Sequence, residues 1–272
     1  MSDGPALDPT RRFSSRAENY AKYRPGYPAA ILDLLRDECQ FTSASVVADI
    51  GSGTGILTSL FLANGNVVFA VEPNREMREQ AERLLGWETG FLSVPGKAEA
   101  TTLPPQKIDL ITASQAFHWF KPELARQEFL RILKPGSAQP DTLKHELQPS
   151  GWVALIWNER HGGFDSFLED YEELLVKHAT GYTGSGRHPV EAISSFFGPA
   201  GFREAIFPNW QTLDWEGLKG RLLSSSYAPE PGHPQHLPML DGLEAIFNRH
   251  QSDGKVTFKY DTLVFYGRLT NI

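Results

Sequence analysis

Three glycines in the segment DIGSGTG, residues 49–55, have the spacing of a ligand-binding loop. Gly51, Gly53 and Gly55 allow the backbone to turn tightly and to approach a ligand more closely than a residue with a Cβ atom can. The segment follows the apolar run VVADI and precedes a helix-like stretch, residues 56–63. A helix that begins behind such a loop directs its first amides towards the same point. The pattern therefore predicts a strand, a ligand-binding loop and a helix in succession.

An acidic residue ends the next apolar run, VVFAVE, and narrows the ligand class. Glu72 is placed where a nucleotide-binding α/β unit accepts hydrogen bonds from the two ribose hydroxyls. The dinucleotide fingerprint also needs a glycine or alanine three residues after its second glycine, but Ile56 or, in the alternative register, Thr58 stands there. A phosphate-binding loop would end in Gly-Lys-Ser/Thr, which is absent. These residues favour a nucleoside with an amino-acid tail over NAD, FAD or a nucleoside triphosphate.

The elements around the loop alternate between continuous apolar runs and amphipathic stretches. This alternation predicts an α/β fold with a parallel sheet covered by helices on both faces. The last hundred residues add two strand-like segments and further helical ones, which we interpret as a helical cap on a single domain. The expected strands are 46–50, 67–72, 108–114, 152–157, 202–210 and 255–267. The expected helices begin at Pro28 or span 56–63, 74–85, 164–178, 215–223 and 241–247, with another around 129–133. Asn74 is expected to cap the helix that follows it.

The chain resembles class I S-adenosylmethionine (SAM)-dependent methyltransferases, in the branch that includes the trans-aconitate and ubiquinone/menaquinone-biosynthesis enzymes. The resemblance begins near residue 13 and continues to the end of the chain. It rests on motifs that agree in order and spacing: FSSRAENYAKYRPGYP, ADIGSGTG, AVEPNREM, GKAEATTLP, SQAFHWF, EFLRILKPG and SSSYAP. It implies a Rossmann-like doubly wound sheet of seven strands, the last antiparallel, with SAM as cofactor and S-adenosylhomocysteine as product. The polar segment 137–150 departs from the family pattern, and we interpret it as a surface insertion.

The resemblance also assigns roles to individual residues. It places the three loop glycines against the methionine and ribose portions of SAM, with Asp49 supporting the loop. It gives the ribose hydroxyls to Glu72. The remaining cofactor contacts that it implies are Pro73, Ala98 and Glu99 near the adenine, and Ser114 and Gln115 beneath the methionine part.

Methyl transfer from a sulfonium requires alignment and exclusion of water, and it needs a general base only if the acceptor must lose a proton. His118, just after the fourth strand, is the candidate base, although a lone histidine is more often structural. Arg160 follows the fifth strand at its carboxyl end, which is the ligand side of such sheets. The candidate substrate contacts are Phe117, Trp119, Asn158, Arg160 and Tyr227. The alternative for Phe117 and Trp119 is a place in the core, and the alternative for Arg160 is a solvated surface position.

The N-terminal segment, residues 13–28, is predicted to be a lid over the cofactor. It carries three tyrosines and an arginine, which is too aromatic for a disordered tail. The resemblance carries cofactor contacts over to Tyr20 and Arg24, and a guanidinium is a two-pronged donor for the methionine carboxylate of SAM. The alternative is an ordinary helix in which Arg24 forms a surface ion pair. We expect a flexible tail at 1–12, one domain over 13–272, and cap insertions at about 160–200 and 214–250.

Composition excludes several other classes of function. The net charge of -7 and the absence of a basic stripe disfavour a nucleic-acid partner. Cys39 is the only cysteine, so neither an internal disulfide nor a thiolate zinc site is expected, and no metal is implied. No segment is apolar enough for a membrane span or a signal peptide, which predicts a cytoplasmic protein. Nothing in the sequence indicates an oligomeric state.

Three functions remain open. The first is an enzyme that methylates a small molecule on oxygen, either a hydroxyl or a carboxylate. The second is an RNA or protein methyltransferase of the same fold, although SQAF stands where nucleobase amino-methylating enzymes carry an Asp/Asn-Pro-Pro-aromatic motif. The third is a SAM-binding regulatory protein without catalysis, since a binding loop alone does not establish a reaction.

Overall fold

The computed structural model describes residues 16–135, 151–160, 166–182, 184 and 190–270. The predicted tail at 1–12, the first three residues of the predicted lid and the predicted insertion at 137–150 lie outside the described residues. The chain divides into two compact units. We call residues 27–157, 188–207 and 262–272 the sheet unit, and residues 1–26, 158–187 and 208–261 the helical unit.

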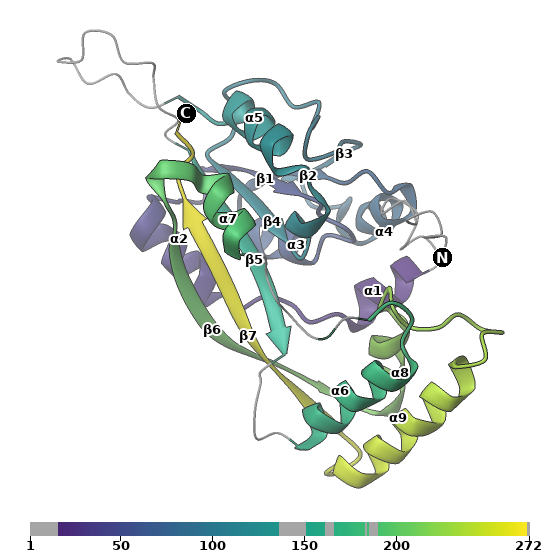
Figure 1. Cartoon of the computed structure of the whole chain (residues 1–272). Helices are drawn as coiled ribbons and strands as arrows, with labels where there is room; N and C mark the ends of the chain where they lie inside the picture. Colours follow the sequence, from purple (N-terminus) through teal and green to yellow (C-terminus); the bar gives the residue numbers. More distant parts are fainter. Residues whose placement is uncertain (1–15, 136–150, 161–165, 183, 185–189, 271–272) are drawn as a thin grey trace, which may run out of the picture. The chain divides into compact units, whose positions relative to one another are not determined.

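Seven strands form one sheet in the order β3-β2-β1-β4-β5-β7-β6. The pairs β3–β2, β2–β1, β1–β4 and β4–β5 are parallel, and β7 runs antiparallel to β5 (Figure 1). The predicted seven-stranded α/β fold with an antiparallel last strand is therefore confirmed. The strands are β1 Val46–Ile50, β2 Val67–Val71, β3 Phe91–Val94, β4 Leu110–Ser114, β5 Trp152–Arg160, β6 Arg203–Leu213 and β7 Val256–Gly267.

Helices of the sheet unit cover both faces of the parallel strands. Alternate residues of β5 point to opposite faces, so that Leu155 belongs to one buried cluster and Ile156 to the other. Helices α5 and α7 complete the first cluster, and α2 and α3 complete the second. Burial on both faces explains why these strands are continuous apolar runs. The helices of this unit are α2 Ala30–Cys39, α3 Ile56–Ala63, α4 Arg75–Leu85, α5 Pro122–Ile132 and α7 Val190–Phe197.

The bounds and the buried face of helix α4, which lies next to the glycine loop, follow from its local sequence. The Asn74 side chain accepts a hydrogen bond from Met77 N at 2.8 Å and so caps the helix, as the sequence predicts. Met77 and Ala81, four residues apart, form its buried face. Gly86 caps the carboxyl end. The helix therefore begins three residues after Glu72, close to the end of β2.

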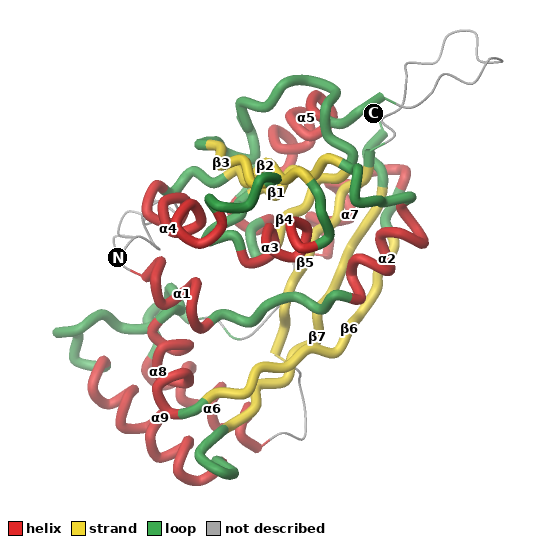
Figure 2. The backbone as a smooth tube through the Cα atoms, turned by 180° about the vertical axis from the view of Figure 1, so that it is seen from behind, coloured by secondary structure: helices red, strands yellow, loops and turns green. Residues whose placement is uncertain are grey.

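The helical unit has its own hydrophobic core. Side chains of α6, α8 and α9 pack there with Phe258 and Tyr260 of β7. Figure 2 shows these three helices together with α1. An added Cβ at Gly242 would lie 2.5 Å from Leu174 Cδ1, so the glycine allows α9 to pack closely on α6. The helices of this unit are α1 Ala17–Tyr23, α6 Ser166–His178, α8 Trp215–Leu223 and α9 His236–His250.

Several elements differ from the sequence prediction. Strand β3 was not expected, because FLSV is a short, partly exposed edge strand without a continuous apolar run. Strand β5 continues to Arg160, so Asn158 and Arg160 lie within the strand rather than after it. Helix α7 lies in the range expected for the cap but belongs to the sheet unit. Helix α9 begins at His236, inside the segment interpreted as a proline-rich loop, because Pro238 occupies its first turn, where proline is tolerated.

Among the described helices, none has both the length and the apolar composition needed to cross a membrane.

Candidate functional site

The glycine loop adopts a left-handed backbone at all three predicted glycines, with φ of 69° at Gly51, 57° at Gly53 and 85° at Gly55. An added Cβ at Gly51 would lie 2.7 Å from Ala116 Cβ, and one at Gly55 would lie 2.5 Å from Leu85 Cδ1. At Gly53, apart from its chain neighbours, the described residues would bring only the end of Met77 within 4 Å, at 3.4 Å. Packing against the rigid Ala116 Cβ requires glycine at position 51, whereas the contact at Gly55 is with the flexible end of Leu85. Of the three positions, Gly53 is the least crowded by the described residues.

Glu72 is tied directly to this loop. Its Oε2 atom accepts a hydrogen bond from Gly53 N at 2.9 Å, and its Oε1 atom accepts one from Asn74 N at 2.7 Å. Burial raises the pKa of Glu72, which is 8% exposed, and the two N–H donors lower it in part. Each carboxylate oxygen has a second lone pair, so an oriented Glu72 can still accept from a ribose hydroxyl.

Asp49 connects three elements beneath the loop. Its carboxylate accepts hydrogen bonds from Thr58 Oγ1 of α3 at 2.7 Å and from Thr112 Oγ1 of β4 at 3.1 Å. Complete burial raises the pKa of Asp49 to about 6, and the two threonine hydrogen bonds oppose this shift. Asp49 thus fastens the end of β1 to its neighbours, which agrees with the supporting role implied by the resemblance.

Two hydroxyls in the loop identify it as a place for a polar ligand. Ser52 Oγ and Thr54 Oγ1 are buried and have no hydrogen-bond partner in the described structure. Buried polar atoms are nearly always hydrogen-bonded in folded proteins. The methionine amino and carboxylate groups and the ribose hydroxyls of SAM are partners of the required kind, so the residues fit this cofactor. Neither hydroxyl was predicted from the sequence, although their position between the three glycines was a signal.

The other predicted cofactor residues lie at the ends of the strands that follow. Glu99 accepts a hydrogen bond from Lys121 N at 2.7 Å, which ties the segment after β3 to the start of α5. Gln115 has a positive φ of 52° and donates from its backbone N to Ile156 O at 2.9 Å. Pro73, Ser114 and Gln115 are half-buried, and Ala98 is buried.

A short 3-10 helix, η2 (Phe117–Trp119), carries the candidate base and two aromatic residues. Phe117 is 1% exposed and packs against Phe196 with ring centres 5.0 Å apart. Of the two alternatives for this residue, the structure thus places it in the core. His118 and Trp119 are exposed, and their ring centres are 4.7 Å apart. The imidazole is accessible for proton transfer, and the catalytic role of His118 stays a prediction.

The helical unit contains the predicted cofactor contacts of the N-terminal segment and the predicted substrate contacts at the end of β5. The guanidinium carbon of Arg24 lies 4.9 Å from the centre of the Tyr20 ring. Asn158 Nδ2 donates to Gly26 O at 3.1 Å and so holds the segment after α1 against β5. Arg160 forms an ion pair with Glu172 of α6 at 2.7 Å. Arg24 is half-buried and donates to Ser224 O and Ser225 Oγ rather than to a described carboxylate. The lid role of this segment and the alternative of a surface ion pair for Arg24 both stay predictions.

Tyr227 lies among positive charges. Burial alone would raise its pKa, but nearby guanidinium groups lower the pKa of Tyr227 to about 8. These groups belong to Arg160, Arg221 and Arg24. Arg221 and Tyr171 were not predicted as site residues, because each lies on an amphipathic helix where its residue type carries no local signal.

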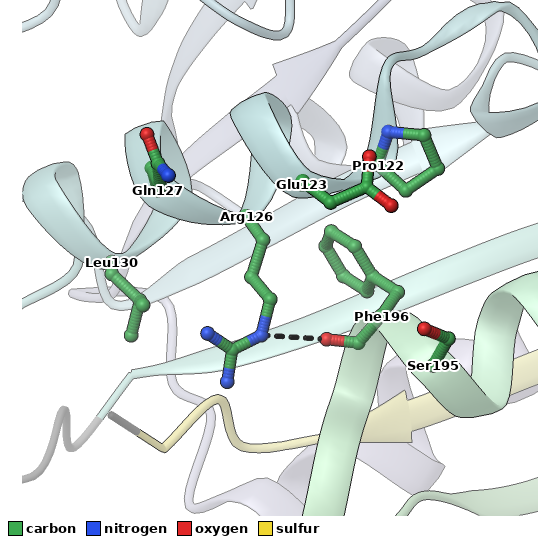
Figure 3. Close-up of a pocket in the computed structure, with 7 residues that line it drawn as sticks. All are labelled: Pro122, Glu123, Arg126, Gln127, Leu130, Ser195 and Phe196. Atoms are coloured by element: carbon green, nitrogen blue, oxygen red, sulfur yellow. Dashed lines mark hydrogen bonds between the residues drawn. The ribbon is translucent and has the colours of Figure 1, made fainter. Parts of the chain in front are cut away.

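A separate pocket of about 420 Å³ lies between α5 and α7. Arg126 crosses it and donates from Nε to Phe196 O at 2.9 Å (Figure 3). None of the predicted site residues lines this pocket, so it is distinct from the glycine loop. Its walls are Pro122, Glu123, Arg126, Gln127, Leu130, Ser195 and Phe196.

Within the described residues, no group of three or more histidine, cysteine, aspartate or glutamate side chains is arranged to hold a metal ion.

Comparison with known proteins agrees with this geometry. Residues 48–138, from the end of β1 through α5, match the model of a methyltransferase domain. An uncharacterized methyltransferase of Schizosaccharomyces pombe is 30% identical over 266 residues, which cover 94% of this chain and 96% of that protein. A protein of Saccharomyces cerevisiae named a probable SAM-dependent methyltransferase is 28% identical over 173 residues, which cover 59% of this chain and 58% of the relative.

Solved structures show the same fold. A protein from Anaeromyxobacter dehalogenans assigned as a type II methyltransferase has a TM-score of 0.63 and 20% identity, over 92% of this chain and all of that one. Phosphoethanolamine N-methyltransferase 2 of Haemonchus contortus, solved with S-adenosylhomocysteine and phosphomonomethylethanolamine, has a TM-score of 0.53 and 15% identity. That likeness covers 97% of this chain and 59% of the other.

A seven-stranded sheet with a glycine loop after β1 and an acid at the end of β2 defines a nucleoside-binding α/β protein. The chain belongs to the class I SAM-dependent methyltransferases, and SAM is its cofactor. The narrower resemblance to the trans-aconitate and ubiquinone/menaquinone enzymes stays a prediction.

Proposed function

We propose that this methyltransferase transfers the methyl group of SAM to an oxygen atom of a small molecule, a hydroxyl or a carboxylate. The observation that carries the proposal is that the predicted acceptor contacts include a guanidinium group, Arg160, beside a phenol, Tyr227. Arg160 and Tyr227 are near enough for the guanidinium charge to lower the phenol pKa. Positive and hydroxyl-bearing side chains recognise oxygen-rich small molecules. We therefore assign Asn158, Arg160 and Tyr227 to acceptor binding.

In the proposed reaction, SAM supplies a methyl group on an already activated sulfonium. The protein has to bind the donor, orient the acceptor oxygen in line with the methyl carbon, and exclude water. Glu72 and the loop around Gly53 are proposed to hold the ribose and the methionine part. Trp119, 37% exposed beside His118, is proposed to contact the acceptor. Phe117 has no role in this proposal because it lies in the core.

The need for a base depends on the acceptor. A hydroxyl must lose its proton as the new bond to carbon forms, and the exposed imidazole of His118 is the proposed proton acceptor. A carboxylate is already ionised near neutral pH and needs no base. Replacing His118 by alanine therefore distinguishes the two acceptors. We expect kcat to fall about a hundredfold or more with a hydroxyl acceptor and to change little with a carboxylate, while SAM affinity stays unchanged in both cases.

The experiment is methyl transfer from radiolabelled SAM to a panel of hydroxy acids, phenols and carboxylic acids, with Glu72→Ala as the inactive control. A carboxyl methyl ester releases methanol in mild base and a methyl ether does not, so the product identifies the acceptor atom. Transfer only to nitrogen or sulfur acceptors would contradict the oxygen assignment. Transfer only to RNA or protein would favour the second function that the sequence left open. SAM binding without any transfer would favour a regulatory protein.

A further inference from the structure

Three arginines and two tyrosines in the helical unit form a group that the proposed reaction does not fully use. Arg221 of α8 is 3% exposed and Tyr171 of α6 is 0% exposed. Arg24 follows α1, Arg160 ends β5, and Tyr227 follows α8. We call these five residues the arginine–tyrosine cluster. Although separated by up to 203 positions, they lie in one compact unit.

The positive charge of the cluster exceeds its negative charge. Arg160 forms an ion pair with Glu172 at 2.7 Å. In contrast, neither Arg24 nor Arg221 pairs with a carboxylate in the described part of the chain. Arg24 donates to Ser224 O and Ser225 Oγ, both at 3.2 Å. Arg221 donates to Tyr260 Oη at 3.3 Å and to Ser225 Oγ at 3.4 Å. Arg221 is buried and Arg24 is half-buried. Charges withdrawn from water are normally paired, so these two guanidinium groups, held by neutral acceptors among the described residues, point to the binding of an anion.

Two buried polar atoms in the cluster also have no partner. Arg24 Nε and Tyr171 Oη are shielded from solvent and form no hydrogen bond in the described structure. The first is a donor, and the second can donate through its hydrogen. A carboxylate or phosphate group accepts several hydrogen bonds at once and would satisfy donors of both kinds.

The guanidinium groups of the cluster influence the pKa values of the same two tyrosines. All three guanidinium groups act on the Tyr227 phenol, and those of Arg160 and Arg221 act on the Tyr171 phenol. Burial and the charge of Arg221 both lower the pKa of Arg24, because two positive charges repel each other at close range. Arg24 and Arg221 also share the acceptor Ser225 Oγ. The guanidinium carbon of Arg160 lies 5.7 Å from the Tyr171 ring centre. These contacts and the common electrostatic neighbours place the three arginines in one region of the helical unit.

We propose that the arginine–tyrosine cluster binds a carboxylate or phosphate group of the methyl acceptor. The proposal rests on the proposed function, since it names the substrate class of that reaction: a small anion whose acid group is held in the helical unit. The same chemistry has a second source, the methionine carboxylate of SAM, to which the resemblance assigns Arg24. The experiment separates the two sources.

A purely structural role for the arginines makes a different prediction. The guanidinium carbon of Arg221 lies 5.5 Å from the Phe258 ring centre, and that of Arg160 lies 5.7 Å from the Tyr171 ring centre. Such cation–π contacts stabilise a fold without any ligand. If packing were the whole role, replacing these residues would change unliganded stability but not the response to anions.

The first measurement is the thermal stability of the full chain against inorganic phosphate and malonate, at constant ionic strength with chloride. We expect a saturable rise in Tm for the wild type. Arg221→Met should weaken the apparent anion affinity at least tenfold, and Tyr171→Phe should weaken it about threefold to tenfold. Tyr171→Phe removes one unpartnered hydroxyl and keeps the ring, so it remains informative if Arg221→Met does not fold. Arg249→Met is the matched control, because Arg249 lies in the same unit and its side chain is 64% exposed.

The second measurement compares the affinities of S-adenosylhomocysteine and 5′-methylthioadenosine, which lacks the amino-acid tail. If the cluster binds the acceptor, Arg221→Met and Arg24→Lys should bind both nucleosides like the wild type. A tenfold loss for S-adenosylhomocysteine alone would assign the cluster to the donor carboxylate and overturn the assignment to the acceptor.

Anion binding does not require methyl transfer, so the two proposals fail separately. Suppose that the anion response is saturable and depends on Arg221 and Tyr171, but that the protein methylates no oxygen. This result would support anion binding by the cluster and would overturn the proposed function. The proposal that the cluster binds an anion would be overturned if the wild type showed no saturable response, or if both variants responded like the wild type. This holds whatever the enzyme methylates.

Discussion

Arg24 and Arg221 donate to the same acceptor, Ser225 Oγ, over 3.2 and 3.4 Å. Two like charges from distant parts of the chain are thus held by one buried hydroxyl. Ser225→Ala should leave donors of both guanidinium groups unpaired and lower the free energy of unfolding by about 1–3 kcal/mol. Urea denaturation of the full chain measures this loss. Ser59→Ala is the control, because Ser59 is exposed and donates only to Ile56 O of its own helix. Equal stability of the two variants would show that Ser225 does not compensate the charges.

Glu72→Gln tests the link between the acid and the glycine loop. An amide has one acceptor oxygen, so it cannot accept from Gly53 N and Asn74 N and also retain two oxygens for the ribose. We expect SAM affinity to fall about tenfold to a hundredfold, or roughly 1.5–3 kcal/mol. Calorimetry measures the change, with Glu79→Gln on the exposed face of α4 as the control. Unchanged binding would mean that Glu72 does not hold the ribose.

Alanine at Gly51 and at Gly53 should produce different defects. The Cβ at Gly51 would overlap with Ala116, so Gly51→Ala should lower the stability of the protein without ligand. The Cβ at Gly53 would meet only the flexible end of Met77, although the positive φ adds some strain. Gly53→Ala should therefore weaken SAM binding more than it lowers Tm. If thermal and calorimetric measurements showed that Gly53→Ala lowers Tm more than it weakens SAM binding, the ligand would not lie against Gly53.

The sequence predicted the glycine-loop region well because its signals are local. The bounds of β1 and α3 are as predicted, since an apolar run and flanking glycines mark both ends, and Asn74 caps α4 as expected. Strand β3 was missed because an edge strand needs no continuous apolar run. The arginine–tyrosine cluster could not be predicted as a group. Arg24 and Ser225 are separated by 201 positions, and their contact depends on packing between α1 and α8 that no local pattern encodes.

Asp49 should make stability depend on pH. Its folded-state pKa is raised to about 6 from an ordinary value of 3.8, so the folded protein holds this proton more tightly than the unfolded chain. Its contribution is therefore fully present below pH 3.8 and is lost as the pH rises through about 6. Asparagine does not titrate, so the stability of Asp49→Asn relative to wild type should rise between pH 4 and pH 7, by at most about 3 kcal/mol. A difference that stays constant over this range, measured by urea denaturation, would contradict the raised pKa.

Gly220 should control how α1 packs on α8, and with it the position of Arg24. An added Cβ at Gly220 would lie 2.1 Å from Tyr23 Cε2, an overlap that requires the Tyr23 ring or one of the two helices to move. We expect Gly220→Ala to lower the free energy of unfolding by about 1–3 kcal/mol. Because Arg24 follows Tyr23 directly, the same variant should also weaken the stabilisation by phosphate and malonate. Gly26→Ala is the matched control, since a Cβ there would meet no atom of the described residues within 4 Å, its chain neighbours aside. If Gly220→Ala keeps both the stability and the anion response of the wild type, α1 is not held on α8 by the Tyr23 contact.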